Sequence, residues 1–175
     1  PGCPAAAPDP AGFAAAAQAD RAADVVVVAL GDEAGMFGRG TSGEGCAAED
    51  LRLPGVQGEL LDALLATGTP VVLVLLSGRP YALGRYADRL AGIVQAFFPG
   101  EEGGPAVAGV LSGRVNPSGR LPVGVPRDPG GQPATYLASP LGRRSEVSNL
   151  DPTPLFPFGH GLSYGTSSWS NARLV

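Results

Sequence analysis

The run Val25-Val26-Val27-Val28-Ala29-Leu30, bounded by Asp24 and Gly31, decides the fold class of this chain. β-Branched residues favour strands, and an apolar run without polar alternation is typical of a strand that is buried on both faces of its sheet. Such strands occur in parallel sheets whose faces are covered by helices. The run therefore predicts an α/β fold.

Further strands alternate with helices after this run. Two more apolar runs, Val71–Leu76 and Ile93–Phe98, are each followed by a cluster of turn-forming residues. Apolar spacing, helix propensity and chain-breaking residues predict four helices: Phe13–Ala23, Gly55–Thr67, Tyr81–Arg89 and Pro105–Leu111. This alternation predicts a mostly parallel β-sheet with right-handed crossovers, sandwiched between helices as an α/β sandwich.

The periodic pattern fades from Asn116 onward. Residues Leu121–Val125 are expected to form one more strand, but residues 133–164 follow no helical or strand period. We therefore expect an extended, irregular C-terminal segment that lies over the sheet. Its expected apolar anchors are Leu155, Phe156, Phe158, Leu162 and Tyr164.

Composition excludes several classes of protein. The 175 residues fit one domain, and 44% hydrophobic with 16% charged residues is too apolar for a disordered chain. The formal net charge is -4 and the arginines are scattered, so no nucleic-acid surface is predicted. The longest apolar run, Val71–Leu76, is far shorter than the roughly 20 residues of a membrane helix, so we predict a soluble chain without a membrane span.

The ends and the cysteines add little chemistry. The start Pro1-Gly2-Cys3 has no initiator Met and no signal-peptide pattern, so we expect a piece of a longer protein and leave secreted and cytoplasmic locations open. The two cysteines, Cys3 and Cys46, lack metal-site spacing and lie far from His160 along the chain, so no metal site and no cofactor are predicted. Two free thiols are favoured over a disulfide between them.

A long loop, from Gly31 to about Pro54, follows the first strand. Open α/β sheets bind ligands at the carboxyl ends of their strands, and loops of this length are often functional. Glu44 is the only charged side chain between Arg39 and Glu49, and Gly, Ser and Thr surround it. A carboxyl with a raised pKa can act as a general acid, as in glycoside hydrolysis. Spacing alone nevertheless favours a solvated surface carboxylate over a catalytic one.

Two other active-site patterns are disfavoured. Gly38-Arg39-Gly40-Thr41-Ser42-Gly43 matches GxGxxG as letters, but the nucleotide-binding form needs its first glycine at the end of the strand and a helix that begins inside the motif. Here no helical pattern begins before Pro54, so nucleotide binding is not favoured. No nucleophile elbow is present either, and a triad around His160 is not indicated.

A series of ordered blocks resembles the C-terminal α/β-sandwich domain of glycoside hydrolase family 3, which contains β-glucosidases and β-xylosidases. The resemblance covers about residues 20–165. The blocks are Ala23-Asp24-Val25-Val26-Val27-Val28, Thr41-Ser42-Gly43-Glu44-Gly45, Leu53-Pro54-Gly55-Val56-Gln57, Val74-Leu75-Leu76-Ser77-Gly78-Arg79-Pro80, Phe98-Pro99-Gly100-Glu101-Glu102-Gly103-Gly104, Asn116-Pro117-Ser118-Gly119-Arg120-Leu121-Pro122 and Phe156-Pro157-Phe158-Gly159-His160-Gly161-Leu162-Ser163-Tyr164.

The resemblance implies a domain of a retaining exo-β-glycosidase that acts on a carbohydrate substrate. It places the general acid/base role on Glu44 and possible substrate contacts on Arg39, Ser42 and Cys46. In the family an N-terminal TIM-like barrel supplies an Asp nucleophile. That barrel is absent from this chain, so the isolated chain is expected to be inactive. A non-catalytic carbohydrate-binding or domain-packing module stays open as the alternative.

The resemblance also implies a division of the chain into three parts. Residues 1–19 form a lead-in segment and residues 20–165 form the α/β-sandwich domain. Residues 166–175 are then a linker or the truncated start of a fibronectin-like domain.

Overall fold

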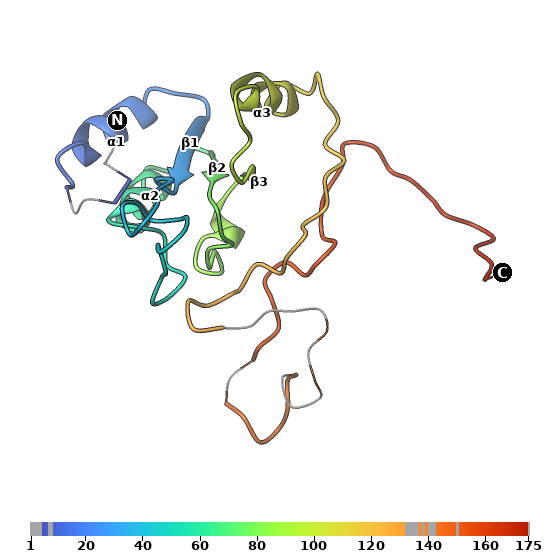
Figure 1. Cartoon of the computed structure of the whole chain (residues 1–175). Coiled ribbons are helices and arrows are strands. Elements are labelled where there is room, and N and C mark those ends of the chain that lie inside the picture. Colours follow the sequence, from blue (N-terminus) through green and yellow to red (C-terminus); the bar gives the residue numbers. More distant parts are fainter. Residues whose placement is uncertain are drawn as a thin grey trace.

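Three parallel strands form the sheet at the centre of the fold (Figure 1). The computed structural model of the chain describes residues 5–6, 9–131, 137, 139, 143–149 and 151–174. The strands β1 (Val26–Gly31), β2 (Val71–Leu76) and β3 (Gly92–Gln95) lie in the order β1-β2-β3. Val26 pairs with Val71 at one end of β1 and Gly31 with Leu76 at the other. The α/β class and the parallel sheet are thus confirmed.

Helices lie on both sides of this sheet. Figure 1 shows α1 (Phe13–Asp20) and α2 (Gln57–Leu65) on one side of the strands and α3 (Gly103–Leu111) on the other. α2 packs with α1 and directs Leu60, Leu61 and Leu64 into the core. Gly68, with φ +88°, follows α2 where the sequence predicted that helix to stop.

The hydrophobic core lies between α2 and the sheet. Leu61, Leu73 and Leu75 are each 0% exposed there, and they pack with buried side chains from β1 and from the segment after β2. Full burial of one such side chain contributes about 1.5–3 kcal/mol. The core therefore fixes the carboxyl ends of β1 and β2 relative to each other.

One expectation about β1 is wrong. β2 is buried along most of its length, but β1 buries only Val28, Leu30 and Gly31, and Val27 is 52% exposed on the opposite face. The physical reason is the position of the last helix. β1 lies at one edge of the sheet, whereas α3 follows β3 at the other edge and so leaves this face of β1 uncovered.

The sequence predicted a helix over Tyr81–Arg89, and this prediction is wrong. The only helical element in the segment is the short 3-10 turn η1 (Ala87–Arg89). Its first backbone donors bond to distant loops. Ala82 N–H donates to the Leu51 carbonyl over 2.8 Å and Gly84 N–H to the Arg127 carbonyl over 3.0 Å. These tertiary bonds hold the first residues of the segment against distant loops, while farther on Ala87 N–H still donates to the Leu83 carbonyl over 2.9 Å.

The later segments also differ from the expectation. β3 ends at Gln95 rather than Phe98, because Phe97 takes a left-handed φ of 53° that interrupts an extended chain. Residues Leu121–Val125 form no strand beyond an isolated antiparallel bridge between Val125 and Phe156. The described part of the C-terminal segment is extended and irregular, as expected. Of its five expected anchors, Leu155 and Phe156 are partly buried, but Phe158, Leu162 and Tyr164 are exposed.

Candidate functional site

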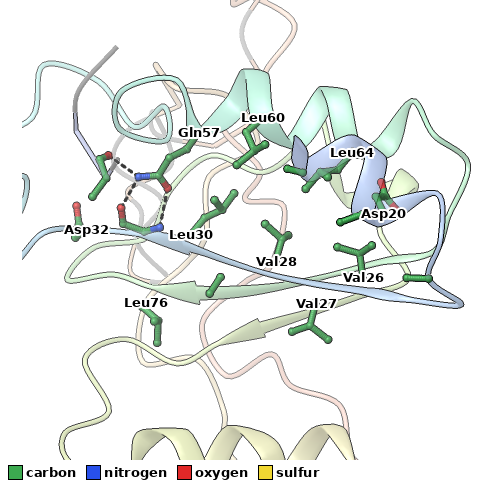
Figure 2. A pocket seen from close by; sticks show the side chains of 16 residues that line it. Asp20, Val26, Val27, Val28, Leu30, Asp32, Gln57, Leu60, Leu64 and Leu76 are labelled. Atoms are coloured by element: carbon green, nitrogen blue, oxygen red, sulfur yellow. Dashed lines mark hydrogen bonds between the residues drawn. The ribbon is translucent and has the colours of Figure 1, made fainter. Parts of the chain in front are cut away.

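The end of β1 is held by a buried glutamine. The Gln57 side chain accepts from Gly31 N–H over 2.7 Å and donates to the Gly31 carbonyl over 2.7 Å and the Ala5 carbonyl over 2.6 Å (Figure 2). Both polar groups of Gly31 are thereby paired without another strand. Gln57 belongs to one of the sequence blocks quoted above, but no role was predicted for it. A glutamine at the start of an apolar helix face is the signal that could have found it.

The loop that leaves β1 is folded tightly on itself. Gly35 N–H donates to the Ser42 carbonyl over 2.9 Å, and Phe37 N–H donates to the Glu44 carbonyl over 2.8 Å. Gly43 has φ +136°, and a Cβ there would lie 1.8 Å from the Gly35 carbonyl oxygen. Its lack of a side chain therefore permits a close backbone approach that holds the neighbouring Glu44 in place.

Asp32, the first residue after β1, joins this loop to the segment after β2. Its Oδ1 accepts from Thr41 Oγ1 over 2.6 Å and from the Tyr81 hydroxyl, and its Oδ2 accepts from Gly78 N–H over 2.9 Å. Burial raises the pKa of Tyr81, and the hydrogen bond to Asp32 raises it further. Asp32, Thr41 and Tyr81 were not predicted as a group, although an acidic residue directly after a strand is a signal.

The four predicted site residues lie on this one loop but face two ways. Glu44 and Arg39 are exposed. Ser42 is 5% exposed and lies so close to Gly78 that a Cβ on that glycine would be 2.1 Å from Ser42 Oγ. Cys46 is buried, and its carbonyl accepts from Arg79 Nη2 over 2.6 Å. The loop therefore presents Glu44 and Arg39 outward and uses Ser42 and Cys46 for its own packing.

The remaining expectations about chemistry concern cysteines, metals and membranes. Cys46 carries a free thiol, and Cys3 lies outside the described residues, so the free thiol expected at Cys3 stays a prediction. Within the described ranges, no cluster of three or more His, Cys, Asp or Glu side chains could hold a metal ion. In the same part of the chain, no helix has the length and apolar character needed to cross a membrane.

A separate cavity of about 570 Å³ runs along β1 beneath α1 and α2 (Figure 2). Its walls are mostly apolar, with Asp20 near one end and Gln57 near the other. None of Arg39, Ser42, Glu44 and Cys46 lines it. The cavity therefore reaches only the base of the Glu44 loop, at Gly31 and Asp32.

Comparison with known proteins decides the family. A sequence model of the glycosyl hydrolase family 3 C-terminal domain matches residues 2–164. The chain belongs to this family. The family 3 chain is 41% identical over 166 residues to a beta-xylosidase from Formosa agariphila, covering 93% of the chain and 22% of that relative. It is 40% identical over 169 residues to a periplasmic beta-glucosidase from Salmonella typhimurium, covering 91% and 21%.

Solved structures give the same family. A beta-glucosidase from Listeria innocua, in complex with glucose, matches with a TM-score of 0.79 and 31% identity over 93% of the family 3 chain and 23% of that protein. The chain thus spans about a fifth of the length of these relatives. It corresponds to the C-terminal domain of glycoside hydrolases.

Proposed function

We propose that this domain supplies the general acid/base of a retaining exo-β-glycosidase, of β-glucosidase or β-xylosidase type, that removes terminal β-linked sugars. The observation that carries the proposal is the placement of Glu44. It is an exposed carboxylate on a loop fixed by backbone hydrogen bonds, after the carboxyl end of β1, in the motif Thr41-Ser42-Gly43-Glu44-Gly45. A rigid backbone with an accessible carboxyl suits proton transfer to a bound sugar.

Glu44 acts twice in the proposed reaction. It first gives its proton to the glycosidic oxygen, while that oxygen leaves with the aglycone and a second carboxylate forms a bond to the anomeric carbon. It then takes a proton from the water that displaces this carboxylate and releases the sugar. Retaining enzymes hold the two carboxyls about 5–5.5 Å apart.

The second carboxylate is proposed to be an Asp of a TIM-like barrel elsewhere in the full-length protein. The 175-residue chain alone therefore has a proton donor without a nucleophile. We propose that it does not hydrolyse glycosides by itself. Mixing it with its barrel would be needed for turnover.

The test is Glu44→Ala in the full-length protein, assayed with a 2,4-dinitrophenyl β-glycoside. That leaving group needs no protonation, so the glycosyl-enzyme forms and its hydrolysis becomes slow, with kcat about 10²- to 10⁴-fold lower. Azide should restore turnover and yield the β-glycosyl azide, because the anion needs no general base. Glu49→Ala, which removes an exposed carboxylate from the same loop, is the matched control and should keep the original rate. Unchanged turnover in Glu44→Ala, or no response to azide, would show that Glu44 is not the acid/base residue.

A second candidate is a non-catalytic module that packs against another domain or binds carbohydrate. Met36 and Phe37 favour it, because they are 55% and 77% exposed on the same loop and apolar side chains at a surface often mark a contact region. In that case Phe37→Ala would weaken domain association or sugar binding, while Glu44→Ala would leave turnover unchanged.

A further inference from the structure

Asp32 lies where three segments of the chain meet. Its backbone N–H donates to the Leu76 carbonyl over 2.8 Å, which continues the β1–β2 ladder by one bond. Its carboxylate then accepts from Thr41 in the Glu44 loop and from Gly78 and Tyr81 in the segment after β2. The side chain therefore ties the Glu44 loop to the carboxyl edge of the sheet.

The three donors require an acceptor-only group at this position. A carboxylate has about four acceptor sites on two oxygens and no donor, so all three hydrogen bonds can form together. An amide at the same place would direct an NH₂ group at one or more of the donors. Tyr81 is almost fully buried, and its phenol is protonated at neutral pH, so its hydroxyl is a donor to Asp32.

Asp32 is connected to Glu44 through two neighbours. Thr41 Oγ1 donates to Asp32 and accepts from Glu33 N–H over 2.9 Å, which fixes its side chain from two sides. Ser42, the next residue, packs against Gly78, whose N–H also donates to Asp32. The carboxylate thus binds Gly78 directly and binds Thr41, the residue before Ser42, so it acts on both sides of the Ser42–Gly78 contact, two residues before Glu44.

We infer that Asp32 is a positioning residue for Glu44, holding the loop so that the Glu44 carboxyl meets the glycosidic oxygen. The inference rests on the proposed acid/base role of Glu44. Asp32 itself is occupied by its three donors and acts only through the loop. Loss of its carboxylate therefore impairs proton transfer more than it impairs the other steps, because displacement of a reacting group by about 1 Å can cost 10²-fold in rate.

The experiment compares two leaving groups in the full-length enzyme. For Asp32→Asn, kcat/KM on an alkyl or unsubstituted phenyl β-glycoside should fall about 10- to 100-fold. With the 2,4-dinitrophenyl glycoside it should change less than about threefold, because that aglycone departs without a proton. Thr41→Val removes only one of the three contacts and should show a smaller loss of the same kind. Asp50→Asn, whose partly buried carboxylate pairs with Arg52 in the same loop, is the matched control and should leave kcat/KM unchanged on both substrates.

A double variant separates this inference from the proposed function. If Asp32 acts through Glu44, Asp32→Asn added to Glu44→Ala causes no further loss. Three results would overturn the inference while Glu44→Ala still responds to azide. They are an equal loss of kcat/KM with both leaving groups, additive losses in the double variant, and unchanged rates in both Thr41→Val and Asp32→Asn. If Glu44→Ala itself turns over normally, the proposed function fails first. Should Asp32→Asn not fold, Thr41→Val alone decides between these outcomes.

Discussion

The stability of the fold depends on whether the Tyr81 hydroxyl is protonated. Its side chain is buried and donates to Asp32, and both burial and this hydrogen bond raise its pKa above the ordinary value of 10.0. The folded state therefore holds the phenol proton more tightly than the unfolded state does. The stability from this group is fully present below pH 10 and is lost as pH rises above 10.

Tyr81→Phe tests this dependence. At pH 8 we expect the variant to be about 1.5–3 kcal/mol less stable, because it lacks a hydrogen bond to a charged group. The difference from the unmodified chain should shrink above pH 10, where the tyrosine of the unfolded state ionises. Urea denaturation at pH 8, 10 and 11 measures both quantities. A Tyr81→Phe deficit that stays constant with pH would contradict the account.

Residue patterns predicted the site only in part. The motif around Glu44 indicated the loop and the small residues that surround the carboxylate. In the structure, the lack of a side chain at Gly43 permits contact with the Gly35 carbonyl. The contacts of Asp32 with Gly78 and Tyr81 join residues 46 and 49 positions apart. No local pattern carries such information, because it depends on how the two loops meet.

At the scale of elements, Gln57 joins the start of α2 to the end of β1. It is almost fully buried, and it satisfies both the N–H and the carbonyl of Gly31. We expect Gln57→Leu to destabilise the chain by about 1–3 kcal/mol for each of these groups left unpaired. Gln18→Leu, at an exposed glutamine of α1, is the matched control and should stay within about 0.5 kcal/mol. Chemical denaturation measures both. Equal effects of the two substitutions would show that Gln57 is not a structural link.

Elements with strong apolar periodicity were predicted well, and those held by distant bonds were not. β2 has the predicted bounds Val71–Leu76, and α2 lies within the predicted Gly55–Thr67. The segment Tyr81–Arg89 has helical composition, but Leu51 and Arg127 accept its first N–H groups. Local propensity is worth only tenths of a kcal/mol per residue, so two tertiary hydrogen bonds can override it.

At the scale of the whole molecule, composition and the alternation of strands with helices predicted the α/β sandwich. They did not predict that the helices cover the two faces of the sheet unequally. Helix α1 begins at Phe13, which packs against the core, while residues 166–174 are exposed. The division into residues 1–19, 20–165 and 166–175 stays a proposal. The sequence could not reveal which face of β1 lacks a helix, since that depends on where α3 lies.

The free edge of β1 leads to a prediction about association of the chain. Among the residues that the structure describes, no strand pairs with the outer edge of β1, Val25 and Val27 are about half exposed, and Val27 also borders the cavity (Figure 2). An apolar, unpaired edge strand is a template for pairing with another chain, and a charge placed on it opposes that pairing. We therefore expect the 175-residue chain to self-associate with rising concentration, and Val27→Lys to reduce this association.

Sedimentation velocity over a hundredfold range of concentration measures the effect. Val115→Lys, at a valine 42% exposed beyond α3, adds the same charge away from the edge and is the matched control. If net charge alone governed association, both variants would increase it equally, because each lysine brings the formal net charge of -4 closer to zero. If the edge of β1 is responsible, only Val27→Lys reduces association, because it adds a charge to the strand with which another chain would pair. A chain that stays monomeric at all concentrations would contradict the prediction.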